Sequence, residues 1–207
     1  TIDRLDFSTE TVSVPTPKLS TAKSSLAAVS SSSYGYFGGG YVSTIDRLDF
    51  STETRTTPTP KLSQAKFDLA AVSSSSYGYF GGGSGVCTID RLDFSTETRT
   101  TPPTSQLSSA RRNLAATSSS SYGYFGGGIG PVNPTGSSGI DRLDFLTETV
   151  TTSSPIVTLK YELAAVSSSS YGYFAGGRNI SIFNTIARLD FSTETVTAPS
   201  RSLTQTK

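Results

Sequence analysis

Hydrophobic and polar positions follow short patterns that recur along the chain. In the stretch TIDRLDF at 44–50, alternate residues fall on opposite faces of an extended strand. The stretch LAAVSS at 26–31 is apolar or small, and YGYFGG at 34–39 ends in glycines, which favour a turn. A weaker Thr-rich run follows STET and leads into a Pro-containing loop. The pattern predicts four short antiparallel strands per repeat.

The repeat itself has a regular spacing. The first Tyr of each SYGYF lies at Tyr34, Tyr77, Tyr122 and Tyr171, with spacings of 43, 45 and 49 residues. Such periods are typical of propellers and solenoids, and four antiparallel strands in this length form one propeller blade. The coils of a parallel β-solenoid are usually shorter and do not need two reversals of this kind. The sequence therefore predicts an all-β propeller.

The two halves of the repeat occur in unequal numbers. The motif that begins IDRLDF, or IARLDF in its last copy, occurs five times, whereas SYGYF occurs four times. We expect a single domain over 1–207, with a half blade at 1–22 and blades at 23–65, 66–110, 111–159 and 160–207. A five-bladed ring needs two further inner strands to complete the half blade, and three sources of these strands stay open. The favoured interpretation is that the chain is an excerpt of a longer propeller. The other two are that part of the sequence was not read, or that another subunit donates the strands.

Composition narrows the class of protein. Tyr and Phe are frequent, and Met and Trp are missing, which suits strands better than helices. The formal net charge of +1 provides no field to attract nucleic acid or an anionic membrane. No apolar run is long enough for a transmembrane helix. Cys87 is the single cysteine, so an intrachain disulfide cannot form.

Several catalytic and metal-binding arrangements are excluded by residue type. The chain has no His, so a Ser-His-Asp triad cannot form, and one Cys cannot build a His/Cys zinc cluster. FGGG lacks the Lys-Ser/Thr of a phosphate-binding loop. Nearly all carboxylates belong to the repeated frame, Asp68 and Glu162 being the exceptions. We therefore expect no enzyme, no cofactor and no metal.

The repeats resemble those of the Kelch family. The stretch YGYFGGGYVSTIDRLDFSTETRT at 34–56 is similar to a Kelch repeat in its aromatic strand, its double Gly and its later apolar strand that ends in an aromatic residue. A basic residue also stands three positions before each first strand, at Lys23, Lys66, Arg111 and Lys160. The usual Trp of the family is missing, and the positions concerned are Val14, Thr57, Thr101, Thr152 and Ala198. The Ser-rich sequence of the repeats is similar to that of Kelch-like repeats in marine bacteriophage structural proteins.

Variation among the copies is confined to one end of the predicted blades. The first and third turns are nearly constant, as SSSS and STET, whereas the second turns and the interblade connections differ. Loops on a rigid frame are common binding sites, although these loops could also differ because nothing constrains them. The candidate ligand-binding residues on this rim are Tyr41, Ile129, Pro131, Asn133, Arg178, Asn179, Ile182, Phe183 and Asn184.

The repeated Asp-Arg pair of IDRLDF is interpreted as structural. We expect its members to form charge-assisted hydrogen bonds between blades, at Asp46, Arg47, Asp90, Arg91, Asp141 and Arg142. The expected function is a binding propeller that recognises a protein or glycan surface, as an adhesion component of a virion or cell surface. The alternatives are a structural spacer in a larger assembly or homo-oligomer, and a cytoplasmic Kelch-type scaffold for partner proteins.

Overall fold

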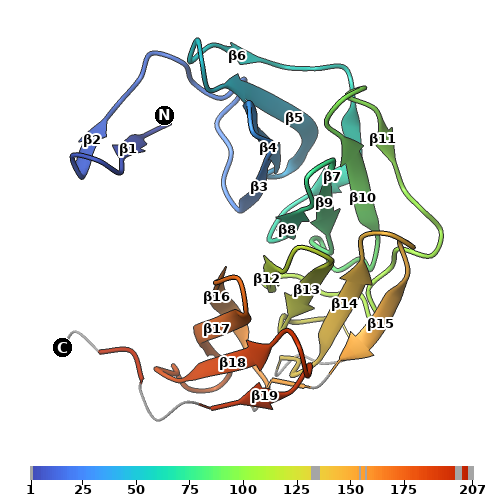
Figure 1. The fold of residues 1–207 in the computed structure, drawn as a ribbon. Helices are drawn as coiled ribbons and strands as arrows, with labels where there is room; N and C mark the ends of the chain where they lie inside the picture. Colours follow the sequence, from blue (N-terminus) through green and yellow to red (C-terminus); the bar gives the residue numbers. More distant parts are fainter. Residues whose placement is uncertain (1, 132–135, 154, 157, 199–201, 205–207) are drawn as a thin grey trace.

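The described part of the chain is built from strands. The computed structural model describes residues 2–131, 136–153, 155–156, 158–198 and 202–204. These residues contain nineteen strands and no helix (Figure 1). No helix in them is therefore long and apolar enough to span a membrane. The fold is all-β, with several four-stranded antiparallel sheets, as the sequence pattern predicts.

The strands group into four similar sheets and one smaller sheet. The N-terminal sheet pairs β1 (Arg4–Asp6) with β2 (Thr11–Ser13). The first sheet comprises β3 (Leu26–Ser30), β4 (Tyr34–Gly39), β5 (Val42–Asp49) and β6 (Arg55–Thr56), and β7 (Lys61–Lys66) also pairs with β5. The second sheet comprises β8 (Ala70–Ser73), β9 (Tyr77–Gly81), β10 (Ile89–Asp93) and β11 (Arg99–Thr100). The third comprises β12 (Ala115–Ser118), β13 (Tyr122–Gly126), β14 (Ile140–Asp144) and β15 (Val150–Ser153). The fourth comprises β16 (Tyr161–Ser167), β17 (Tyr171–Arg178), β18 (Ile186–Asp190) and β19 (Val196–Thr197).

The sheets are arranged as an arc around a common centre. In each four-stranded sheet the first strand lies innermost and the fourth lies at the outside (Figure 1). The inner strands β3, β8, β12 and β16 contact one another in that order. The small Ala and Ser side chains of these strands suit the crowding near the centre. The arc is open between the N-terminal sheet and the fourth sheet (Figure 1).

The two constant turns of each repeat meet at one end of the sheet. In the first sheet the Phe50 amide donates to the Ser33 carbonyl over 3.0 Å, which joins the third turn to the first. The other three sheets repeat this bond, at Phe94 to Ser76, Phe145 to Ser121 and Phe191 to Ser170. The turns that differ among the copies therefore emerge at the opposite end.

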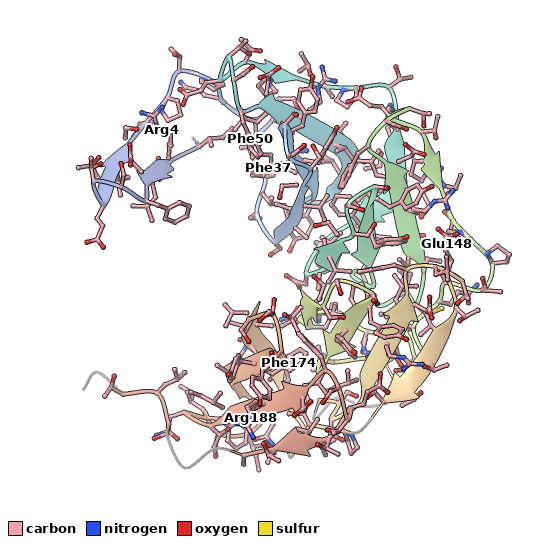
Figure 2. The ribbon with its side chains drawn as sticks, viewed as in Figure 1. Arg4, Phe37, Phe50, Glu148, Phe174 and Arg188 are labelled. Atoms are coloured by element: carbon pink, nitrogen blue, oxygen red, sulfur yellow. The ribbon has the colours of Figure 1, made fainter. Side chains whose placement is uncertain are left out.

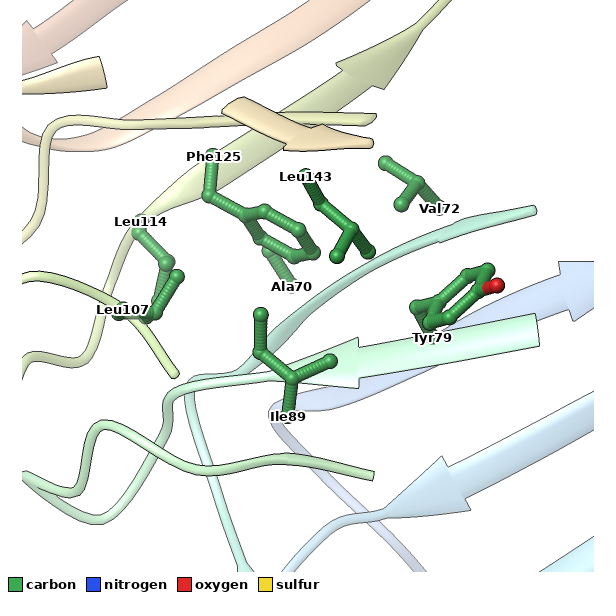
Figure 3. Close-up of a cluster of buried hydrophobic side chains, with 8 residues drawn as sticks. All are labelled: Ala70, Val72, Tyr79, Ile89, Leu107, Leu114, Phe125 and Leu143. Atoms are coloured by element: carbon green, nitrogen blue, oxygen red, sulfur yellow. The ribbon is translucent and has the colours of Figure 1, made fainter. Parts of the chain in front are cut away.

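Neighbouring sheets share a core that is built from the same positions each time. Between the second and third sheets, Tyr79 and Ile89 pack against Leu114, Phe125 and Leu143 (Figure 3). Equivalent residues form the cores between the first and second sheets and between the third and fourth. Each core thus receives one face from the preceding sheet and the other face from the following sheet. This explains why residues on both faces of a strand are apolar.

A glycine in the second strand of each of the first three sheets makes room for the next sheet. A Cβ added to Gly81 would lie 2.6 Å from Cε1 of Phe125. The same closeness holds for Gly38 with Phe80, at 2.8 Å, and for Gly126 with Phe174, at 2.7 Å. The fourth sheet has Ala175 at this position. The glycine therefore allows the close contact between sheets.

The repeated arginine joins adjacent sheets. Nη1 of Arg47 lies 2.6 Å from Oε1 of Glu97, which belongs to the third turn of the next sheet, and its guanidinium lies over the Tyr34 ring at 4.6 Å. The equivalent pairs are Arg91 with Glu148, Arg142 with Glu194, and Arg4 with Glu53. Figure 2 shows Arg4 and Arg188 near the two ends of the arc.

The repeated aspartate is bonded within its own sheet, which differs from the sequence-based expectation of an interblade Asp-Arg pair. Asp46 is fully buried and accepts hydrogen bonds from Lys23, Ser20 and Thr57, each over 3.0 Å. The same pair recurs as Lys66 with Asp90, at 3.1 Å, and Arg111 with Asp141, at 2.7 Å. Side chains at adjacent positions of a strand point to opposite faces, so Asp and Arg cannot serve one contact.

The fourth sheet lacks this network. Ala187 replaces the aspartate, while Lys160 keeps the position of Lys66 and is fully buried. Val157 and Ala198 stand where the second sheet has Ser63 and Thr101, which both donate to Asp90. Among the residues with a described position, no carboxylate lies within ion-pair distance of Lys160.

The carboxylates predict an acid-sensitive fold. In Asp46 burial raises the pKa, but hydrogen bonds from Lys23 and Ser20 outweigh it and leave the pKa lowered. Side-chain and backbone hydrogen bonds from the following Ser and Thr lower the pKa of Asp49, and Asp93 behaves alike. A carboxyl whose folded pKa lies below its unfolded value stabilises the fold above the unfolded pKa, and this stability is lost as the pH falls through the folded pKa.

We therefore expect a melting temperature that changes little down to about pH 5 and falls steeply below about pH 4, where unfolded aspartates begin to bind protons. Thermal unfolding followed by circular dichroism between about pH 7 and about pH 2 measures this. The double variant Asp49→Asn and Asp93→Asn keeps an acceptor oxygen at each position and should make the melting temperature fall less steeply below about pH 4. A melting temperature that is insensitive to acid would contradict the assignment.

Candidate binding rim

The end of the arc with the variable turns carries a stack of aromatic and cationic side chains. Tyr41, from the second turn of the first sheet, is 60 % exposed and stacks on Phe67, with ring centroids 4.5 Å apart. The Arg112 guanidinium lies 5.8 Å from the centroid of the Phe67 ring. Nη1 of Arg112 is 3.3 Å from Oδ2 of Asp68. Three successive repeats thus contribute to one surface.

A cleft lies beside this stack. It has a volume of about 510 Å³, and Phe67, Arg112, Ile129 and Pro131 contribute to its walls. Ile129 is held there by two backbone hydrogen bonds with Arg112, of 2.9 and 2.8 Å. The structure therefore brings the predicted rim residues Tyr41, Ile129 and Pro131 to one area, with Phe67 and Arg112 between them.

A second group of rim residues surrounds Arg178. Its guanidinium makes two hydrogen bonds to Glu162, of 2.5 and 2.8 Å, and lies over the Tyr161 ring at 5.2 Å. These hydrogen bonds lower the pKa of Glu162 and keep it ionised. The Asn113 amide donates to the same carboxylate over 3.0 Å. Arg178 is thus fixed in orientation while half of its side chain stays exposed.

The loop that follows Arg178 carries the remaining predicted residues. The Asn179 side chain donates to the Leu159 carbonyl, and Ile182 is 78 % exposed. Phe183 and Asn184 are partly buried and take part in backbone hydrogen bonds. Asn133 lies outside the described residues.

Four residues that the sequence interpretation missed form a ladder at the same end. The amides of Asp68, Asn113 and Glu162 each donate to the carbonyl of the equivalent residue in the preceding repeat, over 2.8 to 2.9 Å, beginning at Ser25. All four residues have a positive φ of 54 to 57°. These residues immediately precede the apolar first strand of each repeat. The signal that could have found them is the pair of variable residues before each Leu-Ala-Ala. Their side chains differ in every repeat, like the rest of the rim.

The rim combines ion pairs with aromatic rings. Its charged groups are paired with one another, Arg112 with Asp68 and Arg178 with Glu162. Within the described ranges, no group of three or more His, Cys, Asp or Glu residues is placed to hold a metal ion. Aromatic rings and arginines are enriched in the centres of protein interfaces.

Two comparisons with known proteins complete the description. No protein-family model matches the chain, and no curated protein matches it.

Proposed function

We propose that this chain is a non-enzymatic Kelch-like β-propeller module that binds a protein or glycan surface through its variable rim, as an adhesion component of a virion or cell surface. The observation that carries the proposal is the Tyr41, Phe67 and Arg112 stack beside its cleft. Every part of that surface comes from positions that differ among the repeats. The frame beneath it is nearly the same in each repeat.

The propeller reading is supported by the sheets and their packing. Each repeat forms one four-stranded antiparallel sheet, and both faces of a sheet pack on its neighbours. The Kelch reading is supported by the motif at 34–56 and by the repeated basic residue before the first strand. The likeness to repeats of phage structural proteins supports the virion setting.

A pair of point variants tests the binding surface. We expect Tyr41→Ser and Arg112→Ser each to weaken binding by roughly 10-fold or more, because the Tyr and Arg residues that dominate an interface cost about 2 kcal/mol or more when truncated, and about 1.4 kcal/mol corresponds to 10-fold. The measurement is binding of the fluorescently labelled chain to printed arrays of glycans and of cell-surface proteins. Ser75→Ala and Ser120→Ala, at the constant end, are the matched controls.

The arrays also separate the proposed function from its main alternative. Loss of signal in the rim variants with retention in the controls supports rim binding, and the array that responds identifies protein or glycan. If the parent chain binds neither array, the result favours the structural spacer. If all variants bind equally, the binding surface is not the rim, which contradicts the proposal.

A further inference from the structure

One face of the fourth sheet is open although its counterparts are buried. Val72 of the second sheet is 5 % exposed in a core between sheets, whereas its counterpart Val166 is 67 % exposed. Leu107, in the segment that leads into the third sheet, is 4 % exposed, and its counterpart Leu203 is 44 % exposed. The open face of the fourth sheet is therefore one side of a hydrophobic core. Among the described residues, no complete sheet packs against it to form the other side.

The N-terminal sheet presents matching apolar positions. Leu5 of β1 is 50 % exposed, while its counterpart Leu92 in β10 is fully buried. Phe7 is exposed as well. β1 and β2 correspond to the third and fourth strands of a repeat, so β1 has no neighbour equivalent to β9. Its inner edge and its apolar face are both without a partner in the described structure.

The segment that enters this gap already has the register of a repeat. The Leu107 amide donates to the Cys87 carbonyl over 2.8 Å, and the Ile156 amide donates to the Ser138 carbonyl over 2.6 Å. The Leu203 amide donates in the same way to Asn184, over 2.7 Å. Leu203 thus lies against the second turn of the fourth sheet as its counterparts lie against theirs.

The missing contacts belong to one element. In the complete cores, the Leu and Phe of the following inner hairpin, such as Leu114 and Phe125, fill the space between the sheets. We propose that the open face of the fourth sheet and the inner edge of β1 together bind a two-stranded hairpin with the chemistry of this repeat's own inner strands. The hairpin pairs with β1 and completes a fifth sheet.

The charged residues at the gap agree with this occupant. Arg188 lies over the Tyr171 ring at 4.7 Å, as Arg142 lies over Tyr122 at 4.6 Å. Arg142 reaches Glu194 of the next sheet, but Arg188 has no ion-pair partner in the described part of the chain. Glu10 is the equivalent glutamate of the N-terminal sheet and has the same positive φ. A completed fifth sheet brings Glu10 to Arg188.

Ala175 restricts the sequence of the hairpin. A Cβ added to one of the equivalent glycines would lie only 2.6 to 2.8 Å from the Phe ring of the next sheet, so it has no room there. A hairpin that carries Phe at this position therefore clashes with the Ala175 methyl, and one that carries Leu fits better. The occupant has a smaller residue than Phe where Phe125 stands in the third sheet.

The test fuses a hairpin to the full chain after Lys207. One extension is SSLAAVSSSSYGYLGGG, the second has Phe in place of its Leu after YGY, and a scrambled extension is the control. Because the tether supplies a high effective concentration, the Leu extension should protect the amides of β1 from hydrogen exchange at least about 10-fold. The Phe extension should protect them less, and Ala175→Gly should reverse that order.

A charge exchange at the proposed ion pair reports on the closure independently. With the Leu extension, Arg188→Glu should reduce the protection of β1, because it faces Glu10 with a like charge, and Glu10→Arg added to it should restore the protection. Equal exchange of β1 with all extensions would overturn the proposal. So would a dimer of the unextended chain in light scattering with Val166 and Leu203 protected, because a second copy would then cover the face.

Discussion

Lys66→Met is expected to lower the free energy of unfolding by about 3–5 kcal/mol, because it leaves Asp90 buried without its nearest cation. Asp90 is fully buried, and its other hydrogen-bond donors are the hydroxyls of Ser63 and Thr101 and the Ser63 amide. A second cation, Arg99, is more distant, with its Nη1 3.8 Å from Oδ1 of Asp90. Burial lowers the pKa of Lys66, and the neighbouring Asp90 offsets part of that effect. Arg99 lies beyond hydrogen-bond distance and is partly exposed to solvent, so it does not replace the buried lysine at 3.1 Å.

The same substitution in the fourth sheet should have the opposite sign. Lys160 is as deeply buried as Lys66, its pKa is lowered by burial, and Ala187 stands in place of the aspartate. Among the described residues Lys160 has no carboxylate partner, and burial without one disfavours the charged form, so its removal should be neutral or stabilising. Urea unfolding of Lys66→Met and Lys160→Met measures both values. Equal losses in the two variants would show that the lysine stem, rather than the ion pair, provides the stability.

Phe125→Ala is expected to destabilise the protein by about 3–5 kcal/mol, as is usual for a fully buried Phe. Phe125 fills the core between the second and third sheets and lies close against Gly81 (Figure 3). Its counterpart Phe37 faces the N-terminal sheet, which has no inner strands, and is only partly buried. Phe37→Ala should therefore cost clearly less.

Unfolding in urea followed by tyrosine fluorescence compares the two variants. The difference between them measures how much a complete neighbouring sheet contributes to one core. Matching losses would mean that the Phe stabilises its own sheet rather than the contact between sheets, which would contradict the repeated core described above.

The sheets could be predicted from the sequence because their signals are local. Alternation in TIDRLDF, the glycines after YGYF and the Ser-rich turns each act within a few residues, and the repetition gave the same signal several times. The separation of constant and variable turns also follows from strand order alone. The stack of Tyr41 on Phe67 was not predicted, because it joins residues of neighbouring repeats through packing.

The partner of the repeated aspartate depends on contacts that are distant in sequence. Asp46 and Arg47 are neighbours in the chain, but Asp46 bonds to Lys23 and Arg47 bonds to Glu97, 50 residues away. The repeated basic residue before the first strand was visible in the sequence, whereas its burial beside the aspartate was not. Only the arrangement of the sheets shows which faces the two side chains occupy.

Removal of the whole rim surface tests the central claim most directly. The segments 129–138 and 178–184 are exchanged for Gly-Ser linkers of equal length in a chain that also carries Tyr41→Ser and Arg112→Ser, and binding to the protein and glycan arrays is measured beside the parent chain. The predicted result is loss of binding, while the midpoint of unfolding in urea stays unchanged. Binding that survives the replacement, in a chain that remains folded, would contradict a binding function for the rim.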